Sequence, residues 1–460
     1  MRESTDGSSE DLSSAHELRP PSHVSLPYRL AVGSLRLVSP LLTAGDSKLA
    51  RGMAGRRHAH ELLATWGMTV RDRDRPVVWF HAPSVGEGLQ ARAVIEALRE
   101  RIPDVQIVYT FFSSSAEELA RTMGAEVATY LPWDLQSPSA AVLDAVEPDL
   151  LVFTKTEVWP ILTAEASALG VPVAIVGASV PPGAGRMRKP VRKWMESTWA
   201  CLSLGCANTE ADSRGLRELG VPDKSVTATG DPGVDSAASR FEAAPEAADW
   251  LTPLQDDPRP VVVAGSTWPA DEAVLLPALK MVRTEVATLR TIIAPHEPTE
   301  SRVASLLSEL RRDGWRAETL GRVEADGSAE GIDAVVVDRV GVLGHLYAVG
   351  AVSYVGGGFR GDGLHSVLEP AAAATPIVFG PQHHNARAAA DLVTVGGAKI
   401  ARDANALARE VQNWLTDEAE CDRTGRLSRR YIDVHLGAAG RIAELLDGLI
   451  APLSDFDSNA

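Results

Sequence analysis

The sequence predicts an α/β protein made of two halves, each built on a doubly wound parallel sheet. Three observations predict this class. From residue 77 onward, short apolar runs rich in β-branched residues alternate with segments of helical periodicity. The same alternation starts again near residue 261, after a polar stretch. Polar or glycine-rich turns follow several strands, and this edge of an open α/β sheet is where ligands bind.

The composition and charge exclude several classes of function. The chain has 460 residues, which is too long for one core and fits two or three domains. Its formal net charge of −16 argues against nucleic-acid binding. Its three cysteines show no metal or disulfide spacing, and no metal signature appears among its eleven histidines. We therefore expect a reducing compartment and no metal site.

The N-terminal region is predicted in two parts, a disordered tail at 1–25 and an interfacial or packing helical segment at 26–60. Residues 26–42 are apolar but interrupted by prolines and arginines, so they are too short and too charged to span a bilayer. Two interpretations stay open: a helix in the membrane interface, or a helix packed on the protein. A basic cluster follows, which is either a solvated face or a contact for acidic lipid headgroups; it consists of Lys48, Arg51, Arg56 and Arg57.

Residues 61–240 are predicted to form the first half. Helices of moderate length between the strands imply a parallel sheet covered on both faces. Residues 177–190 are expected to form a loop that runs into the most basic stretch of the chain. The strands are expected at 77–80, 106–110, 126–130, 150–153 and 172–176, and the helices at 88–101, 115–123, 137–146 and 160–168.

Residues 241–430 are predicted to form the second half, after a polar linker that ends near residue 257. A C-terminal helix and tail at 431–460 are expected to pack back across the halves. We expect the functional site in the cleft where the strand ends of the two halves face each other. The strands of the second half are expected at 261–264, 291–294, 335–337, 352–355 and 376–379.

The turn after the first strand holds the main catalytic candidate, Glu87. Two glycines flank it, Gly86 and Gly88, and their lack of Cβ lets a substrate approach the backbone. Glu87 lies where free N–H groups and the positive end of a helix dipole point. Its position alone therefore favours an acid that only complements the helix dipole. Glu157 follows another strand at the same sheet edge. Ser113 either caps the next helix or binds sugar hydroxyls.

A glycine-rich loop in the second half predicts an anion site. Residues 356–358 are glycines, Gly363 follows, and a helix is expected to start near Ser366. The spacing matches neither a P-loop nor a dinucleotide fingerprint, which disfavours ATP hydrolysis and NAD binding. Glu369 is either a solvated helix acid or an acceptor for a ribose diol, and the proline directly after it favours the second interpretation.

Seven sequence blocks, in the same order along the chain, resemble the 3-deoxy-D-manno-octulosonic acid (Kdo) transferases, which are GT-B glycosyltransferases of lipopolysaccharide assembly. The combination is far more specific than any one motif. The blocks lie at 79–87, 130–134, 156–160, 264–268, 294–298, 354–359, and 365–370 together with 379–381.

The resemblance implies two Rossmann-like domains that face each other across a cleft and transfer Kdo from CMP-Kdo to a lipid A precursor with inversion. It makes Glu87 the general base, needs no metal or other cofactor, and implies a cytoplasmic protein at the inner face of the cell inner membrane. It implies donor binding by Ser266, Thr267, Pro295, His296, Glu297, Gly356, Gly357, Gly358, Gly363, His365, Ser366 and Glu369. It implies acceptor binding by Ser84, Gly86, Ser113, Glu157, Arg186 and Arg188.

Three departures from the family pattern concern the acceptor and the Kdo carboxylate. Lys155 stands where the family usually has Glu, Ser366 replaces Asn, and Gly233 occupies a position that is often basic. Two alternatives therefore stay open. One is a related transferase with a different sugar or acceptor, and the other is a non-catalytic paralogue that binds a nucleotide-sugar.

Overall fold

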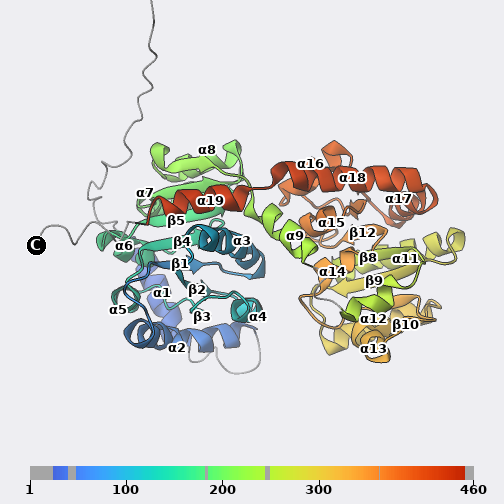
Figure 1. Cartoon of the computed structure of the whole chain (residues 1–460), viewed down its shortest axis with the longest axis horizontal. Coiled ribbons are helices and arrows are strands. Elements are labelled where there is room, and N and C mark those ends of the chain that lie inside the picture. The colour runs from blue at the N-terminus through green and yellow to red at the C-terminus, as the bar shows by residue number, and fades with distance from the viewer. Residues whose placement is uncertain (1–23, 40–47, 182–184, 244–248, 362, 451–460) are drawn as a thin grey trace, which may run out of the picture. The chain divides into compact units, whose positions relative to one another are not determined.

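The computed structural model describes residues 24–39, 48–181, 185–243, 249–361 and 363–450. The chain divides into two compact units (Figure 1). Unit 1 comprises residues 1–230 and 439–460, and unit 2 comprises residues 231–438. Each unit holds one seven-stranded parallel sheet, which confirms the predicted fold class. The predicted tails fall largely outside the described residues, at 1–23 and 451–460.

The unit 1 sheet has the strand order β3-β2-β1-β4-β5-β6-β7. Its first five strands confirm the predicted ones to within about two residues at each end. Strand β6 was missed because its short sequence, Leu-Gly-Cys-Ala, has no β-branched residue. The strands are β1 (Val77–His81), β2 (Gln106–Phe111), β3 (Val127–Tyr130), β4 (Leu150–Thr154), β5 (Val173–Ala178), β6 (Leu204–Ala207) and β7 (Val226–Ala228).

Helices cover both faces of this sheet. Val78 of β1 packs in one core with α3 and α19, and its neighbour Trp79 packs in the opposite core with α2, α5, α6 and α8. The strands are therefore buried on both sides, which explains their continuous apolar sequence. The helices of unit 1 are α1 (Leu26–Val38), α2 (Lys48–Thr69), α3 (Val85–Arg101), α4 (Glu117–Arg121), α5 (Gln136–Val146), α6 (Pro160–Ala168), α7 (Lys189–Ala200), α8 (Glu210–Leu219) and α19 (Ala438–Asp447).

Helix α1 contacts the protein but buries none of its own residues. The Tyr28 hydroxyl donates a hydrogen bond of 2.7 Å to Asp134, while Leu26 and Leu37 stay 66% and 81% exposed. Both interpretations of this segment therefore hold in part, since the helix touches unit 1 and leaves apolar side chains open. Among the helices that the structure describes, none has the length and apolar character needed to cross a membrane.

The unit 2 sheet has the strand order β10-β11-β9-β8-β12-β13-β14. The strands are β8 (Val261–Thr267), β9 (Arg290–Pro295), β10 (Ala317–Thr319), β11 (Ala334–Val336), β12 (Val352–Val355), β13 (Ile377–Phe379) and β14 (Ala398–Ile400). The helices are α9 (Pro232–Glu242), α10 (Thr252–Gln255), α11 (Pro269–Glu285), α12 (Glu300–Arg312), α13 (Leu320–Asp326), α14 (Leu343–Tyr347), α15 (Leu368–Ala372), α16 (Arg387–Val395), α17 (Ala404–Thr416) and α18 (Glu418–His435).

Two helices set the limits of the units. Helix α9 places Val234 and Ala237 in the core of unit 2, so the division falls after Gly230, ahead of the boundary expected at 240/241. Helix α19 places Ile442 and Leu446 in the core of unit 1, whereas α18 belongs to unit 2. The chain thus returns to its first unit at its C-terminal end.

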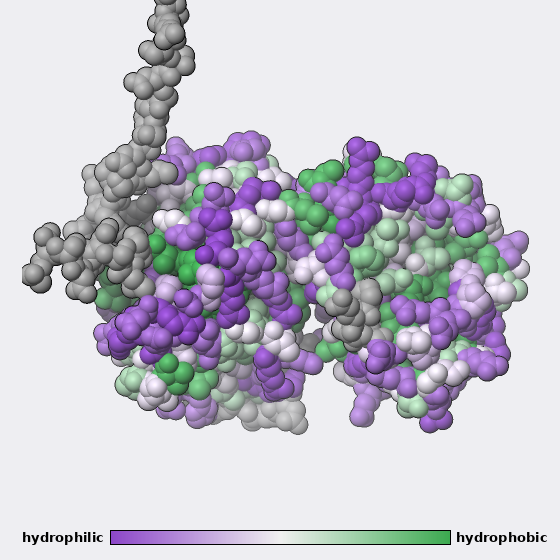
Figure 2. All heavy atoms as spheres, in the orientation of Figure 1, coloured by the Kyte–Doolittle hydropathy of each residue, from purple (hydrophilic) through white to green (hydrophobic). Residues whose placement is uncertain are grey.

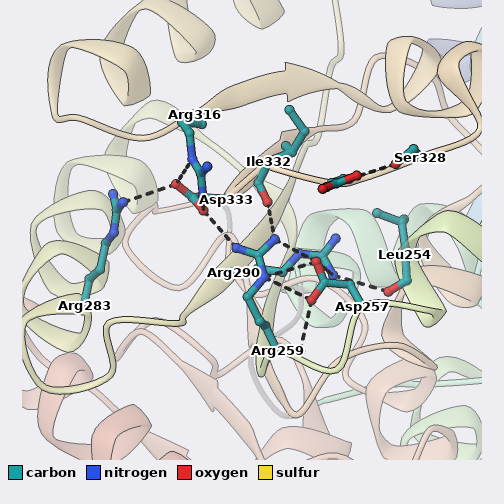
Figure 3. A network of polar contacts seen from close by, with 10 residues as sticks. Leu254, Asp257, Arg259, Arg283, Arg290, Arg316, Ser328, Ile332 and Asp333 are labelled. Atoms are coloured by element: carbon teal, nitrogen blue, oxygen red, sulfur yellow. Dashed lines mark hydrogen bonds and ion pairs between the residues drawn. The ribbon is translucent and has the colours of Figure 1, made fainter.

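An ion-pair network joins the N-terminal ends of four unit 2 strands (Figure 3). The Asp333 carboxylate accepts hydrogen bonds from Arg259 at 2.9 Å, from Arg316 at 2.8 Å and from Arg283 at 3.2 Å. Asp257 pairs with Arg259 at 2.7 Å and with Arg290 at 3.3 Å. These residues precede or begin β8, β9, β10 and β11, so the network holds the sheet edge opposite to the one that carries the candidate site.

Candidate active site

The strand order of unit 1 reverses between β1 and β4, so a ligand crevice is expected at the C-terminal ends of these two strands. The strands pair directly, with His81 opposite Phe153. Ser84 follows β1, Glu87 lies in the first turn of α3, and Lys155 and Glu157 lie in the turn after β4. The pairing of β1 with β4 thus brings together Glu87 and Lys155, which lie 68 positions apart in the sequence.

Glu87 lies in the first turn of α3 with both carboxylate oxygens engaged. The Ser84 hydroxyl donates to Oε2, and the Lys155 ammonium group donates to Oε1 at 3.0 Å. Burial by itself raises the pKa of Glu87, but the Lys155 charge and the two hydrogen bonds outweigh it, so the net pKa lies below the ordinary value. The side chain is therefore a carboxylate at neutral pH, as a proton acceptor must be, and 15% of it is exposed.

His81 is a neutral support beneath this site. Its ring is fully buried, and burial lowers its pKa. The Trp159 indole donates to Nε2 at 3.1 Å, so Nε2 is unprotonated and Nδ1–H donates to Thr110 Oγ1 at 3.1 Å. The Glu157 carboxylate is 4.0 Å from Nε2, too far for a hydrogen bond. His81 thus fixes the position of the turn between β4 and α6.

Arg56 is buried under aromatic rings, which corrects both predictions for the basic cluster at this position. Its guanidinium carbon lies 3.8 Å from the ring centre of Phe112, 5.4 Å from Trp133 and 5.6 Å from Trp159. The side chain is only 4% exposed, and burial lowers its pKa to about 10, against the opposing charge of Glu157. Among the described residues, its Nη2 has no hydrogen-bond partner.

The other residues predicted to bind the acceptor take mixed roles. Arg186 donates to the carbonyl of Thr156 and so holds the turn beside Lys155, whereas Arg188 is exposed at the start of α7. Ser113 caps a short helical turn, as its simpler interpretation predicted. A Cβ at Gly86 would meet open space, but one at Gly88 would lie 2.6 Å from the Tyr109 hydroxyl. Gly88 therefore serves close packing rather than ligand approach.

The strand order of unit 2 reverses between β8 and β12, and the second candidate site lies there. Ser266 has a φ of +54° inside β8, at the register shift between Gly265 and Thr267, and a Cβ at Gly356 would clash with its carbonyl. A Cβ at Gly358 would clash with the backbone of Gly380. Glycine is thus required at these positions because three backbone segments pack against one another.

Asp271 holds the glycine-rich loop in place, a role that the sequence analysis missed. This buried carboxylate accepts hydrogen bonds from the N–H groups of Gly357 at 2.9 Å and Phe359 at 3.3 Å, and from the Tyr354 hydroxyl at 3.1 Å. It also caps α11 through Trp268 N–H. The acid at the start of α11 was visible in the sequence, but only the fold reveals its partners.

An open cavity of about 240 Å³ lies beside the loop, lined by Trp268, Arg360, Gly363, Leu364, His365 and Asn385. The Trp268 indole donates to His365 Nε2 at 2.9 Å, and the His296 ring stacks on the His365 ring at 4.3 Å between centres. Burial, with the nearby His296 and Arg360, lowers the pKa of His365 to about 4. His365 is therefore neutral at physiological pH. Asn385, which the sequence analysis missed, bonds both backbone groups of Leu364 at 2.9 Å.

Two donor-site predictions change in the structure. The Thr267 hydroxyl is buried and donates to Glu272 at 2.8 Å, so it points inward. Helix α15 begins at Leu368, so Glu369 and Pro370 lie in its first turn, where a proline is tolerated and indicates no special role. Ser366 accepts a hydrogen bond from Leu368 N–H at 3.3 Å.

The chain is similar in sequence to known transferases. Residues 57–236 match the family model described as 3-deoxy-D-manno-octulosonic-acid transferase (kdotransferase). The 3-deoxy-D-manno-octulosonic acid transferase of Haemophilus influenzae is 25% identical over 80% of this chain and 86% of its own. That of Bordetella pertussis is 28% identical over the same shares. The chain is thus similar to Kdo transferases over most of its length.

Solved structures share the fold of this chain. A UDP-N-acetylglucosamine 2-epimerase matches with a TM-score of 0.57 and 13% identity, over 81% of this chain and 95% of its own. The putative UDP-N-acetylglucosamine 2-epimerase of Listeria monocytogenes matches with a TM-score of 0.55 and 10% identity, over 81% and 96%. At these identities the likeness shows the fold alone, which is GT-B, with two Rossmann-like units.

Within this fold, the predicted residues gather at two strand edges. Ser84, Glu87 and Glu157 lie at the switch point of unit 1, and His296, His365 and the glycines lie at that of unit 2. Glu369 pairs with Arg240 of α9 and is 17% exposed. Pro295 ends β9, and Glu297 is exposed in the following turn. Among the described residues, no cluster of three or more His, Cys, Asp or Glu could hold a metal ion.

Proposed function

We propose that this protein is an inverting glycosyltransferase that moves Kdo from CMP-Kdo to a hydroxyl group of a lipid A precursor. The similarity to curated Kdo transferases supports the reaction class. The observation that carries the proposal is Glu87, an ionised carboxylate with a lowered pKa at the switch point of unit 1. A carboxylate at such an edge suits a general base for an attacking hydroxyl.

Unit 1 supplies the proton acceptor in this proposal. The Glu87 carboxylate takes the proton of the acceptor hydroxyl as its oxygen attacks the anomeric carbon of Kdo. The pair with Lys155 and the bond from Ser84 hold the carboxylate in one orientation. Pre-orientation of this kind lowers the barrier because less freedom is lost at the moment of reaction.

Unit 2 binds the donor and stabilises the leaving CMP. The glycine-rich loop lines the open cavity at the switch point through Gly363 and Leu364, and the backbone N–H groups of such a loop suit a phosphate. Neutral His365 offers a ring nitrogen proton there without a fixed charge. Glu369 uses Oε1 for Arg240, which leaves Oε2 to accept from ribose hydroxyls. The donor, rather than a metal or another cofactor, brings the reactive group.

Contact with a membrane is part of the proposal, because the acceptor is a lipid. On the face shown in Figure 2, hydrophilic side chains cover most of the described surface of both units. Against that background, α1 exposes Leu26, Leu30 and Leu37, and α7 exposes Trp194 at 53%. Apolar side chains beside arginines suit the headgroup region of the inner leaflet. Co-sedimentation with anionic vesicles should fall when Leu30 and Leu37 are changed to Asp; unchanged binding would exclude α1.

The direct experiment incubates the purified protein with CMP-Kdo and a lipid A precursor. The proposal expects release of CMP together with a gain of one or more Kdo masses on the lipid. Release of CMP only with another acceptor would favour the related transferase, for which the Lys155–Glu87 pair is the favouring observation. Binding of CMP without any turnover would favour a non-catalytic paralogue and would contradict the proposal.

A further inference from the structure

Lys155 occupies a strained backbone position directly at the candidate base. It follows β4 with a φ of +68°, in the left-handed region that side chains with a Cβ rarely adopt. Its N–H donates to the Val176 carbonyl at 2.7 Å, so the neighbouring strand holds this conformation. Strain of this size is retained where the position of a side chain matters for function.

The ammonium group of Lys155 has donors left over after it pairs with Glu87. One N–H is used at 3.0 Å from Oε1, and an ammonium carries three. The Lys155 side chain is 47% exposed, whereas Glu87 is 15% exposed. Within the described part of the chain, no other carboxylate lies within 4.0 Å of it. The remaining donors therefore face the solvent-accessible side of the pair, from which an acceptor must approach Glu87.

The turn around Lys155 is held from both sides. Arg186 donates to the carbonyl of Thr156, the next residue, and Trp159 is fixed by its bond to His81. Such support keeps the ammonium in one place while leaving its tip open. A cation held beside a base can fix an anionic group of a substrate and still not neutralise the base.

We propose that Lys155 is a specificity-determining residue that binds an anionic group of the acceptor, a phosphate or a carboxylate, next to the hydroxyl that Glu87 deprotonates. This inference rests on the proposed function, because it takes Glu87 as the base. The positive charge of Lys155 favours an acceptor with an anion close to its reacting hydroxyl, whereas a glutamate at this position would disfavour such an acceptor.

The first experiment compares two acceptors, a phosphorylated lipid A precursor and the same molecule after phosphatase treatment. Lys155→Gly is the main variant, because glycine adopts the positive φ without strain and the fold is retained. The KM for the phosphorylated acceptor should rise about 10–100-fold relative to the KM for the dephosphorylated one, as expected for loss of a charge-assisted hydrogen bond. Lys155→Arg should keep the preference, and Lys155→Glu should abolish it.

Lys224→Ala is the matched control, since Lys224 is an exposed lysine of unit 1 with no place at the switch point. It should behave as wild type with both acceptors. Equal losses of Lys155→Gly on both acceptors would mean that Lys155 only positions Glu87, and would overturn the proposal.

A second experiment separates this proposal from the proposed function. Binding of glucosamine 6-phosphate, glucuronic acid and glucosamine to the full chain is measured by NMR or calorimetry, with no donor present. Wild-type protein should bind an anionic probe about tenfold or more tightly than glucosamine, and Lys155→Gly should remove the difference. If Kdo transfer fails but this dependence is found, the proposed function is wrong and the anion site stands. If transfer succeeds and no probe binding depends on Lys155, the anion site is wrong.

Discussion

The Lys155 ammonium group lies 3.0 Å from Oε1 of Glu87; Lys155 directly follows β4, and Glu87 lies in the first turn of α3, after β1. This pair sets the charge state of the candidate base. Burial of Glu87 favours the neutral acid, whereas Lys155 and Ser84 favour the carboxylate and prevail. The sign of each effect leads to a measurable pH dependence.

Replacement of Lys155 by Met should shift the acidic limb of the kcat/KM profile to higher pH. In the wild type, activity is lost as the pH falls through the lowered pKa of Glu87, because the protonated acid cannot accept a proton. Without Lys155, burial acts on Glu87 with less opposition and raises its pKa. The shift should be seen with a dephosphorylated acceptor as well. An acidic limb that stays in place would show that the pair does not control the base.

Replacement of Asp271 by Ala should weaken donor binding indirectly, through the glycine-rich loop. The N–H groups of Gly357 and Phe359 would lose their acceptor, so the glycine-rich loop would lose its fixed shape. We expect the Kd for CMP to rise about tenfold and the free energy of unfolding to fall by about 1–3 kcal/mol. Calorimetry and thermal unfolding measure the two effects. Asp326→Ala, at an exposed acid of α13, should change neither; an intact CMP affinity in Asp271→Ala would refute the role.

Replacement of Glu369 by Gln should weaken the donor complex more than it slows the chemical step. The carboxylate would lose its charge-assisted bonds to a ribose, which corresponds to a five- to tenfold higher Kd for CMP. Arg240→Met distinguishes this role from a structural one. It removes the ion pair but leaves the carboxylate, so the Kd for CMP should stay within about threefold of wild type. Equal losses in both variants would point to a purely structural pair.

Replacement of Asp333 by Asn should destabilise unit 2 without changing donor affinity. Three arginines would lose their shared partner at the sheet edge opposite to the site (Figure 3). Since this carboxylate is 6% exposed but some of its partners are open to solvent, we expect the free energy of unfolding to fall by about 2–3 kcal/mol. Denaturant unfolding of both proteins measures it. A stability equal to wild type would show that the network contributes nothing.

The same network predicts acid lability. The bonds from Arg316 and Arg259 outweigh burial and hold the pKa of Asp333 below its ordinary value. A depressed pKa in the folded state contributes stability above the unfolded value of about 4, and this contribution is lost as the pH falls through the folded pKa. The difference in stability between wild type and Asp333→Asn should therefore shrink below about pH 4.

Most strands of each unit could be predicted from the sequence because strands that are buried on both faces have continuous apolar sequences. Residues 77–80 are apolar throughout, since β1 is buried on both faces, and the turn that follows is polar. Strand β6 lacks this apolar pattern because two of its four residues are glycine and alanine. Local periodicity therefore predicted the strands with continuous apolar sequence, and it missed β6 and the three-residue edge strands β7, β10 and β14.

The partners at the site could not be predicted in the same way. Arg56 resembled a solvent-facing helix cation, and only the approach of Phe112 and Trp159 from other elements buries it. Asp271 resembled an ordinary first-turn acid, and its bonds reach 86 and 88 residues along the chain. Glu87 could be named from its motif, but its pairing with Lys155 depends on the adjacency of β1 and β4.

The rate of Kdo transfer in Glu87→Gln tests the central claim most directly. The assay measures CMP release and lipid mass gain, with CMP affinity determined on the same samples and Glu100→Gln, an exposed acid at the far end of α3, as the control. We predict that Glu87→Gln lowers kcat about 10²–10⁴-fold while CMP binds within twofold of wild type, and that the control is unaffected. Turnover near the wild-type rate in Glu87→Gln would contradict the account.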